Sequence, residues 1–165
     1  MRKIKFRGKT KNGEWVQGYL VNSGHQINPY VEFWWIAQNR YDFGTVFNEK
    51  SCDDTFIWNR VEPDTIGQYT GLKDKNGIEI YDGDIVRTMY KEFRDFGDEK
   101  ADYFTSFVEE VVWLPVFNGF GLVYHIADIP VYRPLNYTTE IRGVKLIEVE
   151  VIGNKYDNPE LLEEK

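Results

Sequence analysis

Hydrophobic and polar residues alternate with a period of two along most of the chain, which predicts β-strands. Residues 3–9 alternate cations with Ile4, Phe6 and Gly8, and Lys11-Asn12-Gly13 separates them from the alternating segment EWVQGYLV at Glu14–Val21. Asn-Gly tolerates the positive φ angles of a tight primed turn, so these segments predict a β-hairpin. The same pattern around Asn76-Gly77, between QYTGL and IEIY, predicts a second hairpin.

Four further segments are rich in β-branched and aromatic residues, which favours half-buried strands. They are Ile85–Tyr90, Phe107–Leu114, Gly121–Ile126 and Ile147–Gly153. A helix is indicated only at the C-terminus, where Asn158 is a candidate N-cap, Pro159 stands at the first helical position and acidic residues follow. The fold class predicted is therefore mainly β, or α+β at most, with a short C-terminal helix. The segment 41–60 fits either a short helix or a strand.

Composition indicates a folded, acidic protein. The 165 residues carry 20 Lys and Arg against 27 Asp and Glu, and 16% of them are aromatic, far above what a disordered acidic chain carries. A net charge of −7 argues against coating of nucleic acid by overall charge. The basic N-terminus lacks the apolar stretch of a signal peptide, and no apolar run reaches membrane-spanning length. A soluble, cytoplasmic protein is expected.

Catalytic motifs are not found in the sequence. His25 and His125 stand outside metal-ligand spacings, and Cys52 has no neighbouring cation to activate it. Nucleotide-binding glycine loops and nucleophile elbows are missing. The sequence therefore predicts no catalytic residue, no cofactor and no metal site, and an enzyme is not favoured.

Acidic residues leave one enzymatic alternative open. A calcium loop centred on Gly77 would need a ligand at Leu72, which has no side-chain oxygen, so a hairpin turn is the better interpretation. Asp82 and Asp84 suit a tight turn before the strand that follows. Together with the polar segment Lys91–Asp102, expected to be a surface loop, they could instead form a carboxylate site for a divalent metal.

The basic N-terminal strand is the candidate contact surface. Its residues are Lys3, Lys5, Arg7 and Lys9, with Trp15 and Tyr19 on the following strand. The functional interpretation is a surface that tracks phosphates and stacks bases. The structural interpretation, which we favour, is an edge strand that lysines protect against aggregation, or a face that pairs with acidic groups.

The central segment PDTIGQYTGLKDKNGIEIYDGDIV, at Pro63–Val86 within residues 62–86, resembles the signature of the YopX family. IKFRGKT near the start and IEVEVIGNKYDNPELL near the end are also similar to that family, whose members are small proteins of phages and prophages in Gram-positive bacteria. The resemblance implies an SH3-like barrel in residues 61–165, after an N-terminal β region at 1–60. It implies no activity.

The signature has a structural interpretation: its glycines allow bends, its large residues supply core and its Asp and Asn residues form turns. Its residues are Gly67, Tyr69, Thr70, Gly71, Leu72, Asp74, Asn76, Gly77, Tyr81, Gly83 and Asp84.

Three hypotheses for the function follow. The first is a non-catalytic module that binds a host or phage protein through aromatic surface or an edge strand. The alternatives are a nucleic-acid binder that uses the basic strand and a metal-dependent enzyme. The aromatic content and the exposed edges expected of a small barrel also predict a homo-oligomer.

Overall fold

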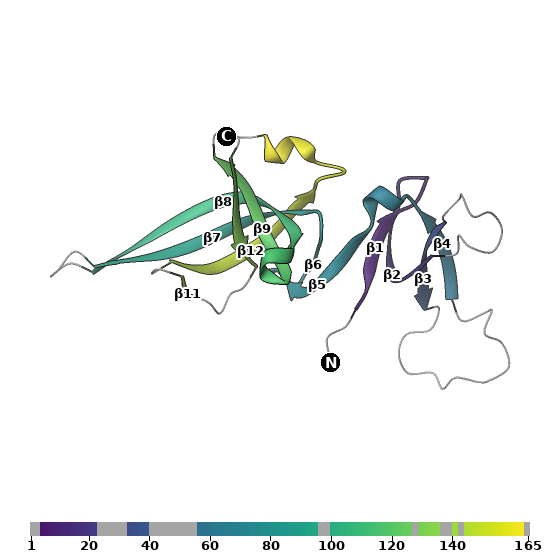
Figure 1. The fold of residues 1–165 in the computed structure, drawn as a ribbon, viewed down its shortest axis with the longest axis horizontal. Helices are drawn as coiled ribbons and strands as arrows, with labels where there is room; N and C mark the ends of the chain where they lie inside the picture. Colours follow the sequence, from purple (N-terminus) through teal and green to yellow (C-terminus); the bar gives the residue numbers. More distant parts are fainter. Residues whose placement is uncertain are drawn as a thin grey trace, which may run out of the picture. The chain divides into compact units, whose positions relative to one another are not determined.

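The computed structural model of the chain describes residues 4–22, 33–39, 56–95, 100–126, 129–135, 140–141 and 144–163. The chain divides into two compact units, Met1–Tyr69 and Thr70–Lys165 (Figure 1). The sequence analysis placed the division after residue 60. It lies later because Gly67 and Gln68, at the start of β5, pair with β1 of the first unit.

The mainly β class is confirmed. The strands are β1 Phe6–Lys9, β2 Trp15–Asn22, β3 Trp34–Asn39, β4 Phe56–Val61, β5 Gly67–Lys73, β6 Glu79–Tyr81, β7 Asp84–Asp95, β8 Lys100–Leu114, β9 Gly119–Ile126, β10 Ile129–Pro134, β11 Glu140–Ile141 and β12 Val144–Asn154. Three short 3-10 turns join them: η1 Pro63–Thr65, η2 Pro115–Phe117 and η3 Pro159–Leu162.

The first sheet has the strand order β4-β3-β2-β1-β5-β6, and β1 to β4 with the start of β5 belong to the first unit. Its core contains Ile36, Ala37 and Val61, each at most 3% exposed. Gly18 is required where β2 meets β3, because a Cβ there would collide with the backbone carbonyl of Ala37. The end of β1 also reaches β4, since Thr10 and Val61 form an isolated bridge.

Both predicted hairpins are present, and their turns share one geometry. In the β1–β2 turn, Gly13 N donates to Thr10 O at 2.9 Å and Thr10 N donates to Glu14 O at 2.8 Å. The turn from Asp74 to Ile78 repeats both bonds at 3.0 and 2.8 Å. The primed turn type was wrong: only the glycines have positive φ, 88° and 82°, as in a type I turn closed by a left-handed glycine.

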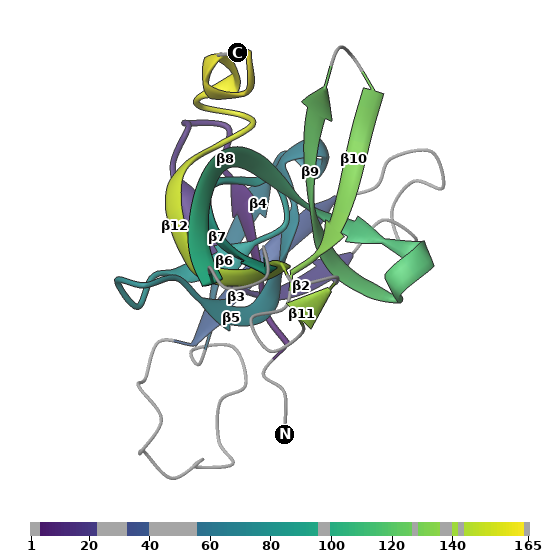
Figure 2. The same cartoon turned by 90° about the vertical axis from the view of Figure 1, so that its left-hand side faces the viewer.

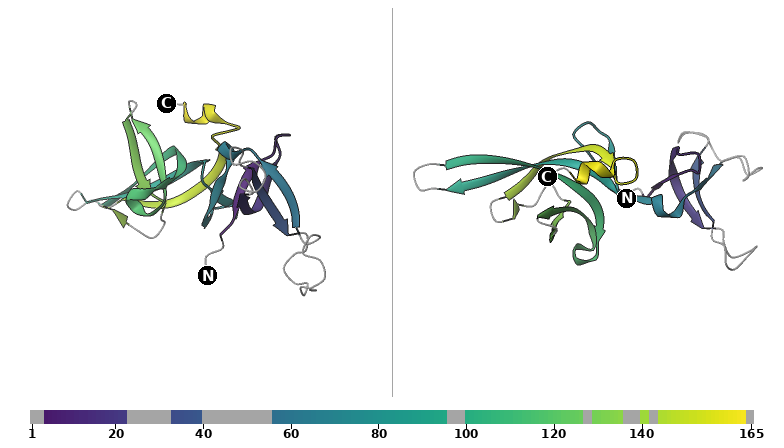
Figure 3. Two further views of the ribbon diagram at one scale, coloured as in Figure 1. Left: turned by 45° about the vertical axis from the view of Figure 1, so that its right-hand side comes forward. Right: turned by 90° about the horizontal axis from the view of Figure 1, so that it is seen from above.

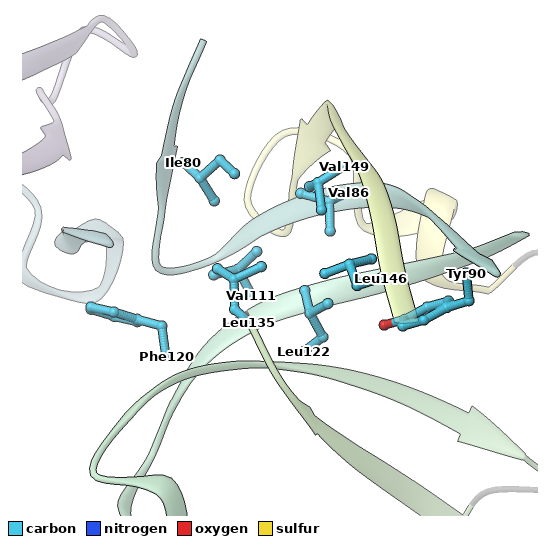
Figure 4. Packing of buried hydrophobic residues seen from close by; sticks show 9 residues of the cluster. All are labelled: Ile80, Val86, Tyr90, Val111, Phe120, Leu122, Leu135, Leu146 and Val149. Atoms are coloured by element: carbon cyan, nitrogen blue, oxygen red, sulfur yellow. The ribbon is translucent and has the colours of Figure 1, made fainter. Parts of the chain in front are cut away.

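The second unit contains the open sheet β10-β9-β8-β7-β12-β11 (Figure 2). All four strands predicted in this part of the chain are found, as β7, β8, β9 and β12. Side chains from these strands, together with Ile80 of β6 and Leu135 after β10, form one buried cluster (Figure 4): Ile80, Val86, Tyr90, Val111, Phe120, Leu122, Leu135, Leu146 and Val149. This face is the framework for the cluster of charged residues described below.

Strands β7 and β8 form a long ribbon (Figure 3). Their pairing continues to Asp95 and Lys100, so the expectation of a loop over Lys91–Asp102 was wrong for all but residues 96–99, which lie outside the described residues. Lys91 Nζ lies 2.7 Å from Asp102 Oδ2 across the ribbon. Lys91 and Glu92 also pair with Lys145 and Val144 of β12, so the sheet continues where the loop was expected.

Two details of the predicted fold differ. Among the strands that the structure describes, neither sheet closes into a barrel, so the SH3-like barrel expected in 61–165 is not seen. The C-terminal helix is the 3-10 turn η3, whose N-cap Asn158 makes no side-chain capping bond. The Asn158 side chain instead accepts from Asn154 N, which leaves the longer helix without its cap.

In the described ranges, no helix is long and apolar enough to cross a membrane.

Candidate functional site

The basic strand β1 lies inside its sheet. It pairs with β2 on one side, where Lys9 faces Trp15 and Arg7 faces Gln17, and with β5 on the other. The edge-strand interpretation was therefore wrong, because β5 returns to cover the second side of β1. Lysines on this strand do not serve to protect an open edge.

One face of these three strands carries cations between aromatic rings. Side chains two residues apart share a face, so Lys5, Arg7 and Lys9 point to one side of β1. The register places Trp15 and Tyr19 of β2 on that same side. Tyr69 of β5 joins them, because its N–H donates to Lys5 O at 2.9 Å. We call this surface the cation–aromatic face.

Each of its three cations lies over a ring. Arg7 Cζ is 4.8 Å and Lys9 Nζ is 5.9 Å from the centroid of Trp15, and Lys5 Nζ is 5.3 Å from that of Tyr69. Cation–π contacts of this length hold the side chains in place. Tyr19 is 45% exposed and remains accessible to a partner. Lys3 lies outside the described residues.

Within the signature, Asp74 makes several hydrogen bonds through its side-chain carboxylate. The carboxylate is 7% exposed and accepts three backbone N–H groups: Asn76 at 2.8 Å, Ile78 at 2.9 Å and Val151 at 3.1 Å. Burial would raise the pKa of this carboxyl, but the bonds from Val151, Ile78 and Asn76 outweigh burial and lower it. Asp74 thus joins its own turn to β12.

Other signature residues also make structural contacts. Thr70 Oγ1 donates to Ile80 O at 2.8 Å, and Tyr81, 1% exposed, donates from its hydroxyl to Glu79 at 2.9 Å. Gly71 and Gly83 have φ of 90° and 81°, which side chains disfavour. The other signature residues lie in the interior or in turns. Gly67 is buried, Leu72 packs against the core, and Asn76 and Gly77 are exposed in the turn.

The acidic residues considered for a metal do not form one site among those that the structure describes. Asp84, 1% exposed, accepts from Tyr81 N at 2.7 Å, as a turn-forming aspartate does. Asp102 pairs with Lys91 instead. Within the described ranges, no three His, Cys, Asp or Glu residues lie close enough together to hold a metal ion. His125 is exposed on β9, whereas His25 and Cys52 lie outside the described residues.

The sequence did not predict a buried charged cluster on the inner face of the second unit. Glu109 of β8 is fully buried, and its Oε2 accepts from Thr88 Oγ1 at 2.5 Å and from Tyr90 OH at 2.9 Å. Its Oε1 lies 3.6 Å from Nη1 of Arg133, on β10. Arg133 Nη2 donates to Tyr124 OH at 2.8 Å.

Aromatic rings surround the Arg133 guanidinium. Its Cζ is 4.4 Å from the ring centroids of Tyr90, Phe107 and Tyr124 alike. Burial raises the pKa of Glu109, and the bonds from Thr88 and Tyr90 together with the charge of Arg133 offset this only in part. Burial and the nearby Glu109 charge also raise the pKa of Tyr90, which keeps its hydroxyl a donor.

Only a weak signal for this cluster exists in the sequence. In the segment FVEEVVWL, Glu109 shares the alternation of Phe107 and Val111, which places it on a buried face. Glu110 beside it shares the other alternation, and both faces contain valine, so the choice between them is ambiguous. Arg133 lies on a proline-flanked strand, IPVYRP, that the sequence does not indicate.

The fold and these surfaces define a two-unit antiparallel β protein with a structured charged cluster in its second unit. Comparison with protein families matches residues 5–163 to the family described as YopX protein, and the chain therefore belongs to the YopX family. The resemblance of the signature is thereby confirmed. The crystal structure of protein EF1440 from Enterococcus faecalis is similar, with 22% identity and a TM-score of 0.43 over 98% of this chain and 99% of that chain. No curated protein matches.

Proposed function

We propose that the protein is a non-catalytic binding module whose cation–aromatic face binds an acidic, extended segment of a protein partner. The observation that carries this proposal is the row of Lys5, Arg7 and Lys9 along one face of β1. Cations on alternate residues repeat about every 6.8 Å, and acidic side chains on alternate residues of an extended peptide repeat at the same distance. An extended peptide bound along β1 would therefore place one acidic side chain opposite each cation.

The distribution of charge supports an acidic partner for the first unit. Met1–Tyr69 contains nine Lys and Arg against eight Asp and Glu, a net charge of +1, whereas Thr70–Lys165 contains 11 against 19, a net charge of −8. Cations already ordered by aromatic rings lose less side-chain entropy on binding than free ones.

Partner identity and location belong to this proposal. The partner is a protein of the phage or of its host, and the site of action is the cytoplasm of a bacterial host. A nucleic acid is the second candidate, because exposed Tyr19 beside a row of cations also suits stacked bases and phosphates. The two candidates share the face and differ in the ligand, so one set of variants separates them.

The test compares two double variants with the same change in charge. Lys5→Gln with Lys9→Gln removes two cations from the face, whereas Lys11→Gln with Lys73→Gln removes two exposed cations elsewhere. The probes are a peptide with Glu at alternate positions, a peptide of the same composition with Glu in one block, and a single-stranded 12-mer DNA. Calorimetry gives the affinity of each at two salt concentrations.

The protein-binding proposal expects the alternating peptide to bind tighter than the block peptide. The face variant should lose about tenfold in affinity for it, at roughly 0.7 kcal/mol for each exposed charge pair, and the control variant should lose much less. DNA that binds tighter than both peptides, with a salt slope that the face variant flattens, would replace the partner by a nucleic acid. Equal behaviour of the two variants would refute the face itself.

A further inference from the structure

The Arg133 cluster has the composition of a guanidinium-binding site. Three aromatic rings lie at the same distance from Arg133 Cζ, 4.4 Å, and a fully buried carboxylate stands behind them. Ring faces attract a cation, and guanidinium is the cation that also stacks flat on them. The Tyr124 hydroxyl adds an acceptor at 2.8 Å. We call Tyr90, Phe107, Tyr124 and Glu109 the guanidinium cage.

The resident arginine leaves this cage partly unsatisfied. Glu109 Oε1 and Arg133 Nη1 are 3.6 Å apart, beyond hydrogen-bond distance, and both atoms are buried. Among the described residues, neither atom has another hydrogen-bond partner. A guanidinium that was not fixed to β10 could move closer and form the short, two-pronged contact that arginine and carboxylate prefer.

The strand that carries Arg133 lies at the end of its sheet. Among the strands that the structure describes, β10 pairs only with β9. Leu135 N donates to Phe120 O. Because the backbone polar groups of successive residues point to opposite sides of a strand, those of Pro130, Tyr132 and Pro134 point away from β9. Two of these three lack an N–H, which prevents a further strand from pairing there. Ile129 and Tyr132 of β10 are 66% and 51% exposed.

We propose that the guanidinium cage is a binding site for an arginine side chain of a protein partner, and that Arg133 occupies it as a tethered competitor in the free chain. The side chain of Arg133 is 25% exposed, so the cage opens to solvent beside it. Release of β10 would open the cage, and the partner's arginine would then contact the three rings and Glu109. This site is independent of the cation–aromatic face, which selects the opposite charge.

The experiment removes the competitor and measures selectivity. Arg133→Met keeps an unbranched side chain and removes the guanidinium, and Arg133→Lys serves if the methionine variant does not fold. The probes are N-acetyl-arginine methylamide and N-acetyl-lysine methylamide, which carry the same charge. Titrations of wild type and variant, followed by tyrosine fluorescence and by NMR, give the two affinities.

We expect the arginine derivative to bind the variant at least tenfold tighter than it binds wild type. We also expect it to bind the variant at least tenfold tighter than the lysine derivative does. Adding Glu109→Gln to the variant should abolish that preference. A folded variant that binds both derivatives equally, or that binds the arginine derivative no tighter than wild type does, would overturn the proposal. Neither outcome depends on the cation–aromatic face, so the two proposals fail separately.

Discussion

Replacement of Asp74 tests whether the YopX signature is required for folding. Its carboxylate accepts three backbone N–H groups, two within its own turn and one from Val151 of β12. The turn N–H groups belong to exposed residues and regain water when the carboxylate is removed, at about 1 kcal/mol each. The half-buried Val151 N–H loses its charge-assisted bond, which costs about 2 kcal/mol.

Asp74→Ala should therefore lower the free energy of unfolding of the second unit by about 4 kcal/mol. Asp74→Asn should lower it by about 3 kcal/mol, because its amide oxygen still accepts in the turn while its NH₂ group faces the Val151 N–H. Asp64→Asn, at an exposed aspartate of η1, is the matched control and should change it by less than 0.5 kcal/mol, roughly the error of the measurement. Amide hydrogen exchange at Leu122 and Val149, in the core of the second unit, reports this free energy.

Acid adds an independent check on the same carboxylate. The pKa of Asp74 is lower in the folded chain than its ordinary value of 3.8. The folded state therefore binds its proton less readily, and the stability that Asp74 contributes is fully present above pH 3.8 and is lost as the pH falls through the folded pKa. The difference between wild type and Asp74→Asn should shrink below pH 3.8. An Asp74→Ala variant within about 1 kcal/mol of the Asp64→Asn control, a quarter of the expected loss, would refute the reasoning.

Three smaller predictions concern backbone positions. Gly18→Ala should destabilise the first unit by more than 2 kcal/mol, about the cost of a core clash, because its Cβ meets the Ala37 carbonyl; Gly119→Ala, whose Cβ would have its nearest contact at 3.7 Å, should cost under about 1 kcal/mol in thermal unfolding. Gly77 has open space around it but a φ of 82°, so Gly77→Ala should cost about 1–2 kcal/mol through left-handed backbone strain alone. Asparagine adopts this conformation more readily, so a Gly77→Asn variant that is no more stable than Gly77→Ala would contradict this explanation. Pro134→Val should restore an N–H on the open edge of β10 and cause concentration-dependent association in light scattering; an unchanged mass would show that the proline does not guard this edge.

The sequence predicted those elements that local rules determine. Asn-Gly located both hairpins, and alternation located the four main strands of the second unit. The ribbon beyond Lys91 was missed because its charges suggested a loop, whereas the backbone pairing of β7 with β8 continues through them. β10 was missed because Pro130 and Pro134 argue against a strand, and only the finished sheet shows that both positions face away from β9.

The sites differ in the same way. The common face of Lys5, Arg7, Lys9, Trp15 and Tyr19 follows from alternation across one hairpin, so sequence reasoning reaches it. Which strand covers the other side of β1 depends on β5, some 60 residues later, and was predicted wrongly. Glu109 and Arg133 meet across β8, β9 and β10, and no local pattern joins them.

The two matching hairpin turns have different consequences for the order of folding. In the first turn, Thr10 Oγ1 accepts from Glu14 N, four residues away, so this bond requires no distant segment to form before it. In the second turn, aspartate replaces threonine, and its additional oxygen bonds Val151, 77 residues later. Because contacts at such separation form late, the first hairpin can form early in folding, whereas the second is complete only after β12 is in place. A chain shortened before β12 would therefore loosen a turn near its middle.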